Sequence, residues 1–223
     1  MKNRIICSVC AGALLLVCAP LNLTAQRATT GVRRPGEAAR RPADAVENMV
    51  RVRKLSGVGR VSLVRTPVFR TNQPAGTRPV GEWAQIATQY DTSPDWIDEL
   101  VFQYYVMTME SEGGANVYSF FRKVVRYVDI ERDNNHMSTV FLHPRTLERY
   151  GDVVAVAVEI TLGGQVAAAE DEVDGGRVRL PENWWTNPNV LQNENLTIRD
   201  GYLLGRDETP FALINIDDYE VIK

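Results

Sequence analysis

Apolar and polar residues alternate with a period of two along most of the chain. The alternation is clearest in residues 118–130, where Phe120 and Val124 are interleaved with Arg122 and Arg126. Successive side chains of a β-strand point to opposite faces of its sheet, so this period indicates strands that bury one face. The pattern therefore predicts a domain built mainly of β-strands.

Turn residues divide this pattern into a series of short strands. Glycine pairs at residues 113–114 and 163–164 are typical of hairpin connections. Only residues 143–151 are predicted to form a short helix, which Gly151 closes in the C-cap position. Strands are predicted at residues 58–64, 82–90, 96–109, 118–130, 137–142, 153–162, 165–169, 202–204 and 211–216.

One predicted strand is apolar on both of its faces. Within residues 96–109, Phe102 and Tyr104 lie on one face, and Tyr105 and Met107 lie on the other. A succession of strands with little helix favours antiparallel sheets that pack face to face. We therefore predict an all-β fold, an immunoglobulin-like β-sandwich with short helical insertions, although periodicity alone leaves a barrel open.

The N-terminal residues have the three parts of a secretory signal peptide. Lys2 and Arg4 precede an apolar run of about 15 residues, and Ala25 stands before a polar stretch. The run is shorter than the roughly 20 residues that a membrane-spanning helix needs. We therefore expect residues 1–25 to be removed on export. The rest is expected in the periplasm, at the outer membrane or on the cell surface, with no transmembrane segment.

The three cysteines, Cys7, Cys10 and Cys18, all lie inside the predicted signal peptide. The processed chain is then free of thiols and relies on core packing rather than on disulfides. Lipidation of Cys18 is the alternative, but Val17 is larger than the residue that usually precedes an acylated cysteine.

Charge divides the remaining chain into a basic flexible arm at residues 26–54 and a β-sandwich domain at residues 55–223. The arm has eight basic and three acidic residues, whereas the domain has 15 basic and 25 acidic residues. Because residues 26–42 contain no aromatic side chain, they are expected to remain without a fixed fold. Residues 43–55 fit either a short helix or a strand.

The arm suggests one set of partner contacts. Its arginines suit contact with acidic polymers of the envelope or with an acidic partner, and an exported protein meets little nucleic acid. The candidate contact residues in the arm are Arg33, Arg34, Arg40 and Arg41.

No motif in the sequence predicts catalysis, a cofactor or a metal site. His136 and His143 are separated by an odd number of strand positions, so they are expected on opposite faces. No nucleophile elbow of the GxSxG type is present. The acidic residues 170–176 lack the alternating spacing of a calcium-binding loop. We therefore expect a protein that is not an enzyme and needs no cofactor.

The adjacent indoles of Trp184 and Trp185 are a further candidate for contact with a ligand or partner. In a strand they would point to opposite faces, whereas in a turn both could cap the core. If they were exposed beside two acids in a cleft, the chain would instead be a carbohydrate-binding or weakly carbohydrate-active protein.

The C-terminal third resembles a known group of small exported proteins. The segments that carry the resemblance are Asn183-Trp184-Trp185, residues 201–212 (GYLLGRDETPFA) and Asp217-Asp218-Tyr219. They are similar to proteins of Verrucomicrobia such as Akkermansia that are encoded beside type IV pilus assembly genes. The resemblance covers at most residue 80 to the end. It implies an immunoglobulin-like domain related to archaeal pilus subunits and supplies no catalytic residues.

One departure from pilins refines the expected role. Type IV pilins keep a long hydrophobic helix after processing, but here residues 26–31 are polar and include Arg27. The sequence therefore favours a pilus-associated assembly or binding protein, acting through protein partners or self-association, over a polymerising pilin.

Overall fold

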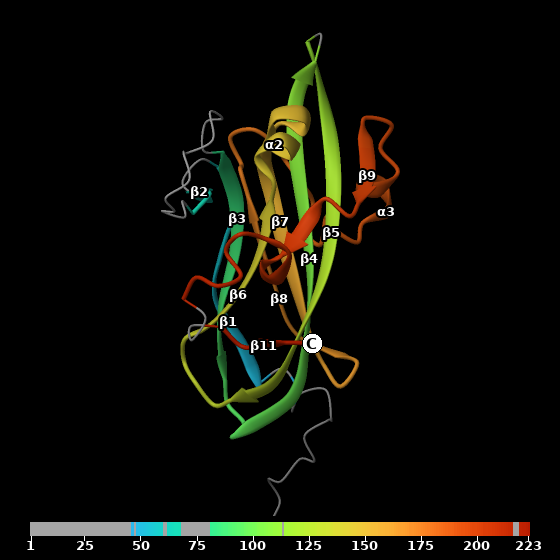
Figure 1. Cartoon of the computed structure of the whole chain (residues 1–223). Helices are drawn as coiled ribbons and strands as arrows, with labels where there is room; N and C mark the ends of the chain where they lie inside the picture. Colours follow the sequence, from blue (N-terminus) through green and yellow to red (C-terminus); the bar gives the residue numbers. More distant parts are fainter. Residues whose placement is uncertain (1–45, 47, 60–61, 68–80, 113, 216–218) are drawn as a thin grey trace, which may run out of the picture. The chain divides into compact units, whose positions relative to one another are not determined.

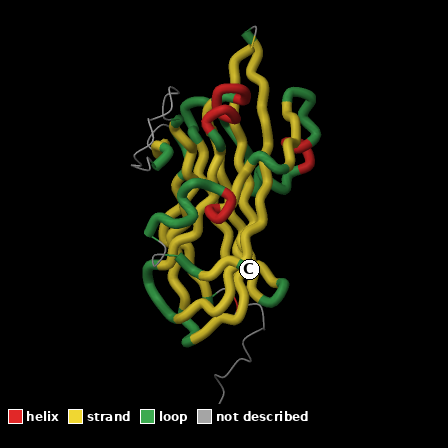
Figure 2. Tube along the Cα trace, in the orientation of Figure 1, coloured by secondary structure: helices red, strands yellow, loops and turns green. Residues whose placement is uncertain are grey.

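The computed structural model describes residues 46, 48–59, 62–67, 81–112, 114–215 and 219–223. Strands dominate this part of the chain, and its helices are short (Figure 2). Two sheets pack face to face, which confirms the predicted all-β sandwich. The expected signal peptide and all but the last few residues of the expected arm lie outside the described residues.

The first sheet has the strand order β1-β3-β6-β10, and β2 pairs with β3 off this path. Every pairing in it is antiparallel. Its strands are β1 (Val50–Ser56), β2 (Leu63–Arg65), β3 (Glu82–Thr92), β6 (His136–Leu142) and β10 (Leu203–Gly205).

The second sheet has the order β11-β5-β4-β7-β8. Its pairings are antiparallel, except that β9 lies parallel to β5. Its strands are β4 (Trp96–Glu112), β5 (Ala115–Glu131), β7 (Asp152–Leu162), β8 (Gln165–Val173), β9 (Leu196–Asp200) and β11 (Val221–Ile222). The hairpin of β4 and β5 extends past the neighbouring strands (Figure 1).

The helical segments are single turns or little more. They are α2 (Pro144–Tyr150), α3 (Pro188–Leu191) and the 3₁₀ turn η2 (Arg206–Glu208). In the described part of the chain, no helix is long and apolar enough to cross a bilayer.

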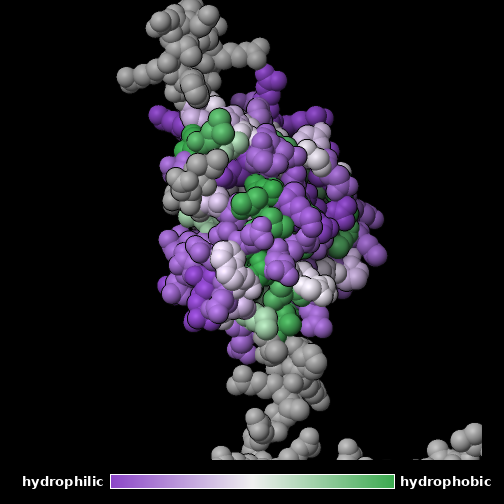
Figure 3. All heavy atoms as spheres, turned by 60° about the horizontal axis from the view of Figure 1, so that its bottom comes forward, coloured by the Kyte–Doolittle hydropathy of each residue, from purple (hydrophilic) through white to green (hydrophobic). Residues whose placement is uncertain are grey.

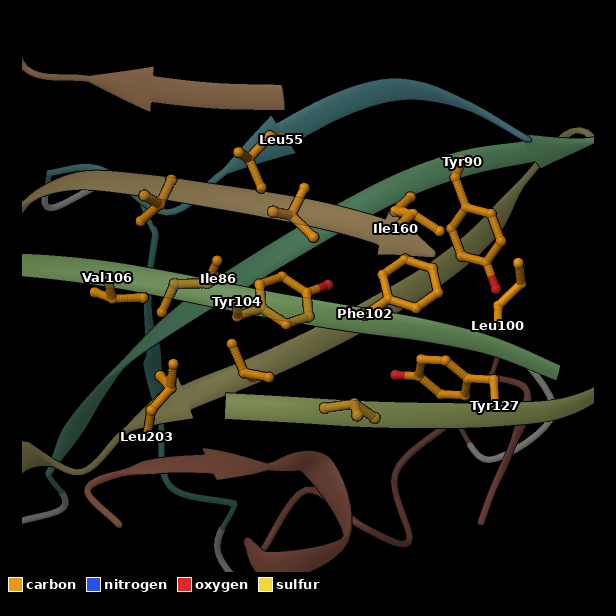
Figure 4. Close-up of a cluster of buried hydrophobic side chains, with 14 of the residues drawn as sticks. Leu55, Ile86, Tyr90, Leu100, Phe102, Tyr104, Val106, Tyr127, Ile160 and Leu203 are labelled. Atoms are coloured by element: carbon orange, nitrogen blue, oxygen red, sulfur yellow. The ribbon is translucent and has the colours of Figure 1, made fainter. Parts of the chain in front are cut away.

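The main core fills the space between the two sheets. Figure 4 shows Ile86 of the first sheet beside Tyr104 and Val106 of the second, and all three are fully buried. The Tyr104 hydroxyl lies 2.7 Å from the hydroxyl of Ser138, so its polar end is satisfied within the core. The inward face of β4 thus behaves as its alternation predicts.

The start of the sandwich differs from the sequence-based boundary. The segment that fitted either helix or strand forms β1 from Val50, so the sandwich includes residues that the sequence assigned to the arm. Within the strand predicted at residues 58–64, the structure shows β2, which begins at Leu63, and residues 60–61 lie outside the described residues. A register shift between Val52 and Lys54 accounts for the weak alternation of this region.

The C-terminal region contains the other differences. Residues 211–215 form turns rather than the predicted strand, and Phe211 stacks on Phe141 with ring centroids 4.7 Å apart. Phe211 is half-buried by this stacking, whereas Leu213 and Ile214 are exposed. The strands β9 and β11 were not predicted, because β9 is largely exposed and β11 has only two residues.

Gly151 ends α2, as predicted, and its backbone conformation is one that residues other than glycine rarely adopt. Its φ is 81° and its ψ is −169°. A Cβ atom at this position would lie 2.0 Å from the backbone oxygen of Met109. The close approach of α2 to β4 therefore depends on glycine.

We expect Gly151→Ala to lower the free energy of unfolding by at least about 2 kcal/mol, because strain and a backbone clash add. Gly164 is the matched control, since its φ is also 81° but no atom lies within 4 Å of its Cβ position. Gly164→Ala should cost only about 1 kcal/mol. Urea denaturation measures both, and equal losses would contradict the clash.

Candidate interaction surface

The outer face of the second sheet is divided into a covered half and an open half. The cap segment (residues 174–195) crosses this face between β8 and β9. Its first backbone N–H, at Asp174, donates to Val154 of β7 at 2.8 Å, and its last carbonyl, at Asn195, accepts from Tyr118 of β5 at 2.8 Å. The segment is therefore tied to both sides of the hairpin strand β4.

Trp184 and Trp185 are the centre of the cap segment. They lie in a turn, and Trp184 is 0% and Trp185 4% exposed. The Trp184 ring meets Phe120 of β5 edge to face, with centroids 6.0 Å apart. The indoles bury the second apolar cluster with the outward residues Tyr105, Met107, Met109, Phe120, Ala155 and Ala157. Both indoles cap a core, as the turn alternative predicted.

This burial corrects two hypotheses from the sequence. Neither Trp184 nor Trp185 is available as an exposed partner contact, because the outward apolar residues of β4, β5 and β7 surround them. The carbohydrate alternative loses its main support, since it required an exposed indole beside acids. The sequence showed the two indoles but not the sheet face that they cover.

Glu159 of β7 fastens the edge of the cap segment. One carboxylate oxygen accepts from the Trp185 indole N–H at 3.0 Å, and the other accepts from the Tyr105 hydroxyl at 3.1 Å. Burial, followed by the nearby Glu159 charge, raises the pKa of Tyr105 to about 12. The phenol therefore stays protonated and can donate throughout the neutral range.

We expect Glu159→Ala to destabilise the fold by about 1–3 kcal/mol, because two part-buried donors lose their acceptor. Glu170→Ala on the exposed part of β8 is the control and should change stability by less than about 0.5 kcal/mol. Urea unfolding followed by tryptophan fluorescence measures both. Equal effects would show that Glu159 does not hold the cap segment.

The open half begins beyond Glu159, and we call it the valine face. Cross-strand pairing places its residues in three rows on one side of the sheet. Thr161 pairs with both Val101 and Val166, and Gln103 pairs with both Val124 and Glu159. The valine face comprises Glu99, Val101, Gln103, Val124, Arg126, Val128, Glu159, Thr161, Val166, Val221 and Lys223.

Apolar side chains of the valine face are exposed to solvent. Val124 is 45%, Val166 53% and Val221 63% exposed, while Val101 and Val128 are half-buried. On the side of the molecule seen in Figure 3, apolar side chains form separate patches within a mostly hydrophilic surface. The five valines share one sheet face, with Gln103, Arg126 and Thr161 between them, and exposed apolar side chains gathered on one face are typical of interaction sites.

Charges at the edge of the valine face are paired with each other. Glu99 accepts from Arg126 at 3.0 Å and from Lys223 at 2.5 Å. These two bonds, from Lys223 first and then from Arg126, hold the pKa of Glu99 below its usual range. With Glu159, the valine face has two acidic and two basic side chains and no net side-chain charge.

His136 and His143 lie in different elements and bond to different partners. The His143 side chain accepts from the backbone N–H of Arg145 at 3.0 Å and caps α2. His136 is buried in β6, where its Nδ1 lies 2.5 Å from a carboxylate oxygen of Glu220 and its Nε2 lies 3.0 Å from the carbonyl oxygen of Glu131. Among the described residues, no group of His, Cys, Asp and Glu is arranged to hold a metal ion.

His136 holds the C-terminal strand β11 against β5 through Glu220. Both ring nitrogens face acceptors, so the doubly protonated imidazolium satisfies both contacts. Burial opposes the charge, but the hydrogen bond and charge of Glu220, followed by Asp133 and the Glu131 carbonyl, raise the pKa of His136 above 6.5. Sequence spacing placed the two histidines apart but could not identify Glu220 as a partner.

We expect this pair to make stability depend on pH. Because the folded-state pKa of His136 is raised, its stabilisation is complete below the unfolded value of about 6.5 and is lost as pH rises through the folded value. Glu220→Gln should remove most of this loss. Urea midpoints between pH 5 and 9 measure it, and identical pH profiles for both proteins would contradict the pair.

A polar groove of about 490 Å³ separates the edges of β1 and β8. Its ionisable side chains are Arg51, Asp91 and Glu170, and Asp91 is already paired with Arg53 at 3.2 Å. This set provides neither a nucleophile with an adjacent base nor a pair of acids across an open cleft. The arm residues Arg33, Arg34, Arg40 and Arg41 lie outside the described residues.

Comparisons with known proteins agree with the sandwich fold. A protein-family model matches residues 43–223. A crystal structure of a protein from Akkermansia muciniphila is similar, with a TM-score of 0.62 and 24% sequence identity over 78% of this chain and 93% of that chain. Among curated proteins, no significant match to the sequence was found. At this identity the crystal structure shows a shared fold alone.

Proposed function

We propose that this chain, which belongs to the protein family whose model spans residues 43–223, is an exported, non-enzymatic assembly or binding protein of the cell envelope, associated with a pilus-like system. The observation that carries the proposal is the valine face, an uncovered apolar half of a sheet whose other half is buried. In a sandwich fold, function lies in such surface sites rather than in the fold itself.

The charge and shape of the valine face favour a protein partner. An extended ligand chain would need free backbone groups, but β4 and β7 in the centre of this face are paired on both sides. The outward side of this part of the sheet presents side chains, among them the methyl groups of Val101 on β4 and Val124 on β5. A flat apolar face of this kind is covered by another packed layer, such as a sheet or a helix.

The non-enzymatic part of the proposal draws on the positions of the candidate residues. His136 bonds Glu220, His143 caps α2, and Glu159 is used by Tyr105 and Trp185. In the described part of the chain, these ionisable groups serve packing and strand attachment. The burial of both indoles also disfavours sugar stacking.

Export and association with a pilus rest on the N-terminal pattern and on the resemblance to Verrucomicrobial proteins. The basic start, apolar run and Ala25 support removal of residues 1–25. The polar residues that follow support an accessory role, because a pilus core is built from a retained hydrophobic helix. The fold shared with the Akkermansia protein is compatible with this role.

In-cell photocrosslinking tests the proposal. A photoreactive amino acid at position 124 should give crosslinks to protein in the envelope fraction, and the purified chain should begin at Gln26. The same amino acid at Lys54, an exposed position on β1, is the control and should give few crosslinks. An unprocessed cytoplasmic chain, or equal crosslinking from both positions, would contradict the proposed function.

A further inference from the structure

The strands that form the valine face have outward apolar residues that the cap segment covers at one end and leaves exposed at the other. The outward residues Tyr105, Met107 and Phe120 are buried under the cap segment. Beyond Gln103 on β4 and Arg122 on β5, the same sheet face continues to Val101 and Val124. The apolar outer face therefore extends past the end of its cover. Val124 is 45% exposed, in contrast to the buried Phe120 on the same strand.

The balance of charge identifies the partner that this face fits. Residues 55–223 have 15 basic and 25 acidic side chains, so most surfaces of two copies repel each other. The valine face differs, because Glu99 and Glu159 together balance the side-chain charges of Arg126 and Lys223 within the face. A two-fold interface brings the same patch of both copies together, which requires a patch without net charge.

We propose that the valine face is a homodimer interface, in which two copies stack their second sheets face to face about a two-fold axis. This inference rests on the proposed function and names a second copy of this chain as the partner. The sheets would lie about 10 Å apart with their strands within about 30° of each other. Val124 of each copy would then be shielded from water by the other.

The size of the face sets the strength of the dimer. Five strands about 4.8 Å apart and three rows about 7 Å apart cover roughly 500 Å² in each copy. The total of roughly 1,000 Å² is below the standard 1,200–2,000 Å² of stable complexes. The dimer is therefore dependent on concentration, and it becomes persistent where copies are gathered together, as in an envelope assembly.

Sedimentation equilibrium of the processed chain, purified after export, tests the proposal over about 1–500 μM. The wild-type chain should pass from monomer to dimer in this range. Val124→Asp and Val166→Asp should each raise the dimer dissociation constant at least about 100-fold, because a carboxylate enters the dry interface twice per dimer. Both valines are about half exposed in the monomer, so both variants should keep the wild-type urea midpoint.

Leu213→Asp is the matched control, since Leu213 is 81% exposed and lies in a turn outside the valine face. It should dimerise like the wild type. A wild-type chain that stays monomeric at 500 μM overturns the proposal, as does a dimer that survives Val124→Asp and Val166→Asp.

The mass of the photocrosslinked product separates this inference from the proposed function. A product of twice the chain mass supports the homodimer. A product with a different envelope protein, together with a monomeric purified chain, overturns the homodimer and leaves the proposed function standing.

Discussion

The central strands of the second sheet are apolar on both faces, and the rest of the structure depends on this constraint. In β4, Phe102 and Tyr104 point into the sandwich, whereas Tyr105 and Met107 point out of it. A sheet of this kind is stable in water only if each face has a cover. The first sheet covers the inner face, and the chain must supply another layer for the outer one.

The cap segment is that second layer, and it accounts for the composition of residues 174–195. Trp184 and Trp185 provide the large apolar surface that one turn can bury, and Glu159 fixes the edge of the layer by accepting from Trp185. Because the segment is short, it reaches only half of the outer face. The valine face is what remains, and its exposed methyl groups connect the fold to the proposed interaction.

Much of the sandwich was predictable because its strands bury one or both faces, which leaves a regular pattern of apolar residues in the sequence. The range 118–130 and the glycine pair at 163–164 predicted β5 and the β7–β8 hairpin. The two-residue β11 and the exposed β9 have no such pattern, since pairing with β5 alone determines them. The strand predicted at residues 211–216 was wrong over 211–215, which form turns: Phe211 stacks on Phe141, and the apolar Leu213 and Ile214 are exposed.

The candidate surface was predictable only in part. Sequence alternation placed Val101 on the same side of the sheet as Tyr105. It could not show that the cap segment covers Tyr105 and leaves Val101 uncovered. That limit depends on contacts far apart in the chain, such as the bond from Trp185 to Glu159. Glu99 and Lys223 are 124 positions apart, so the sequence could not show that they form an ion pair. The charge balance of the valine face was therefore not predictable either.

The most direct test of the valine face is a dilution series of the processed chain, followed by NMR with labelled valine methyl groups. The account predicts that methyl shifts of Val101, Val124, Val128, Val166 and Val221 change together with concentration. Core valines such as Val140 and Val156 should stay constant. Shifts confined to valines outside the face, or no shifts at any concentration, would contradict the account.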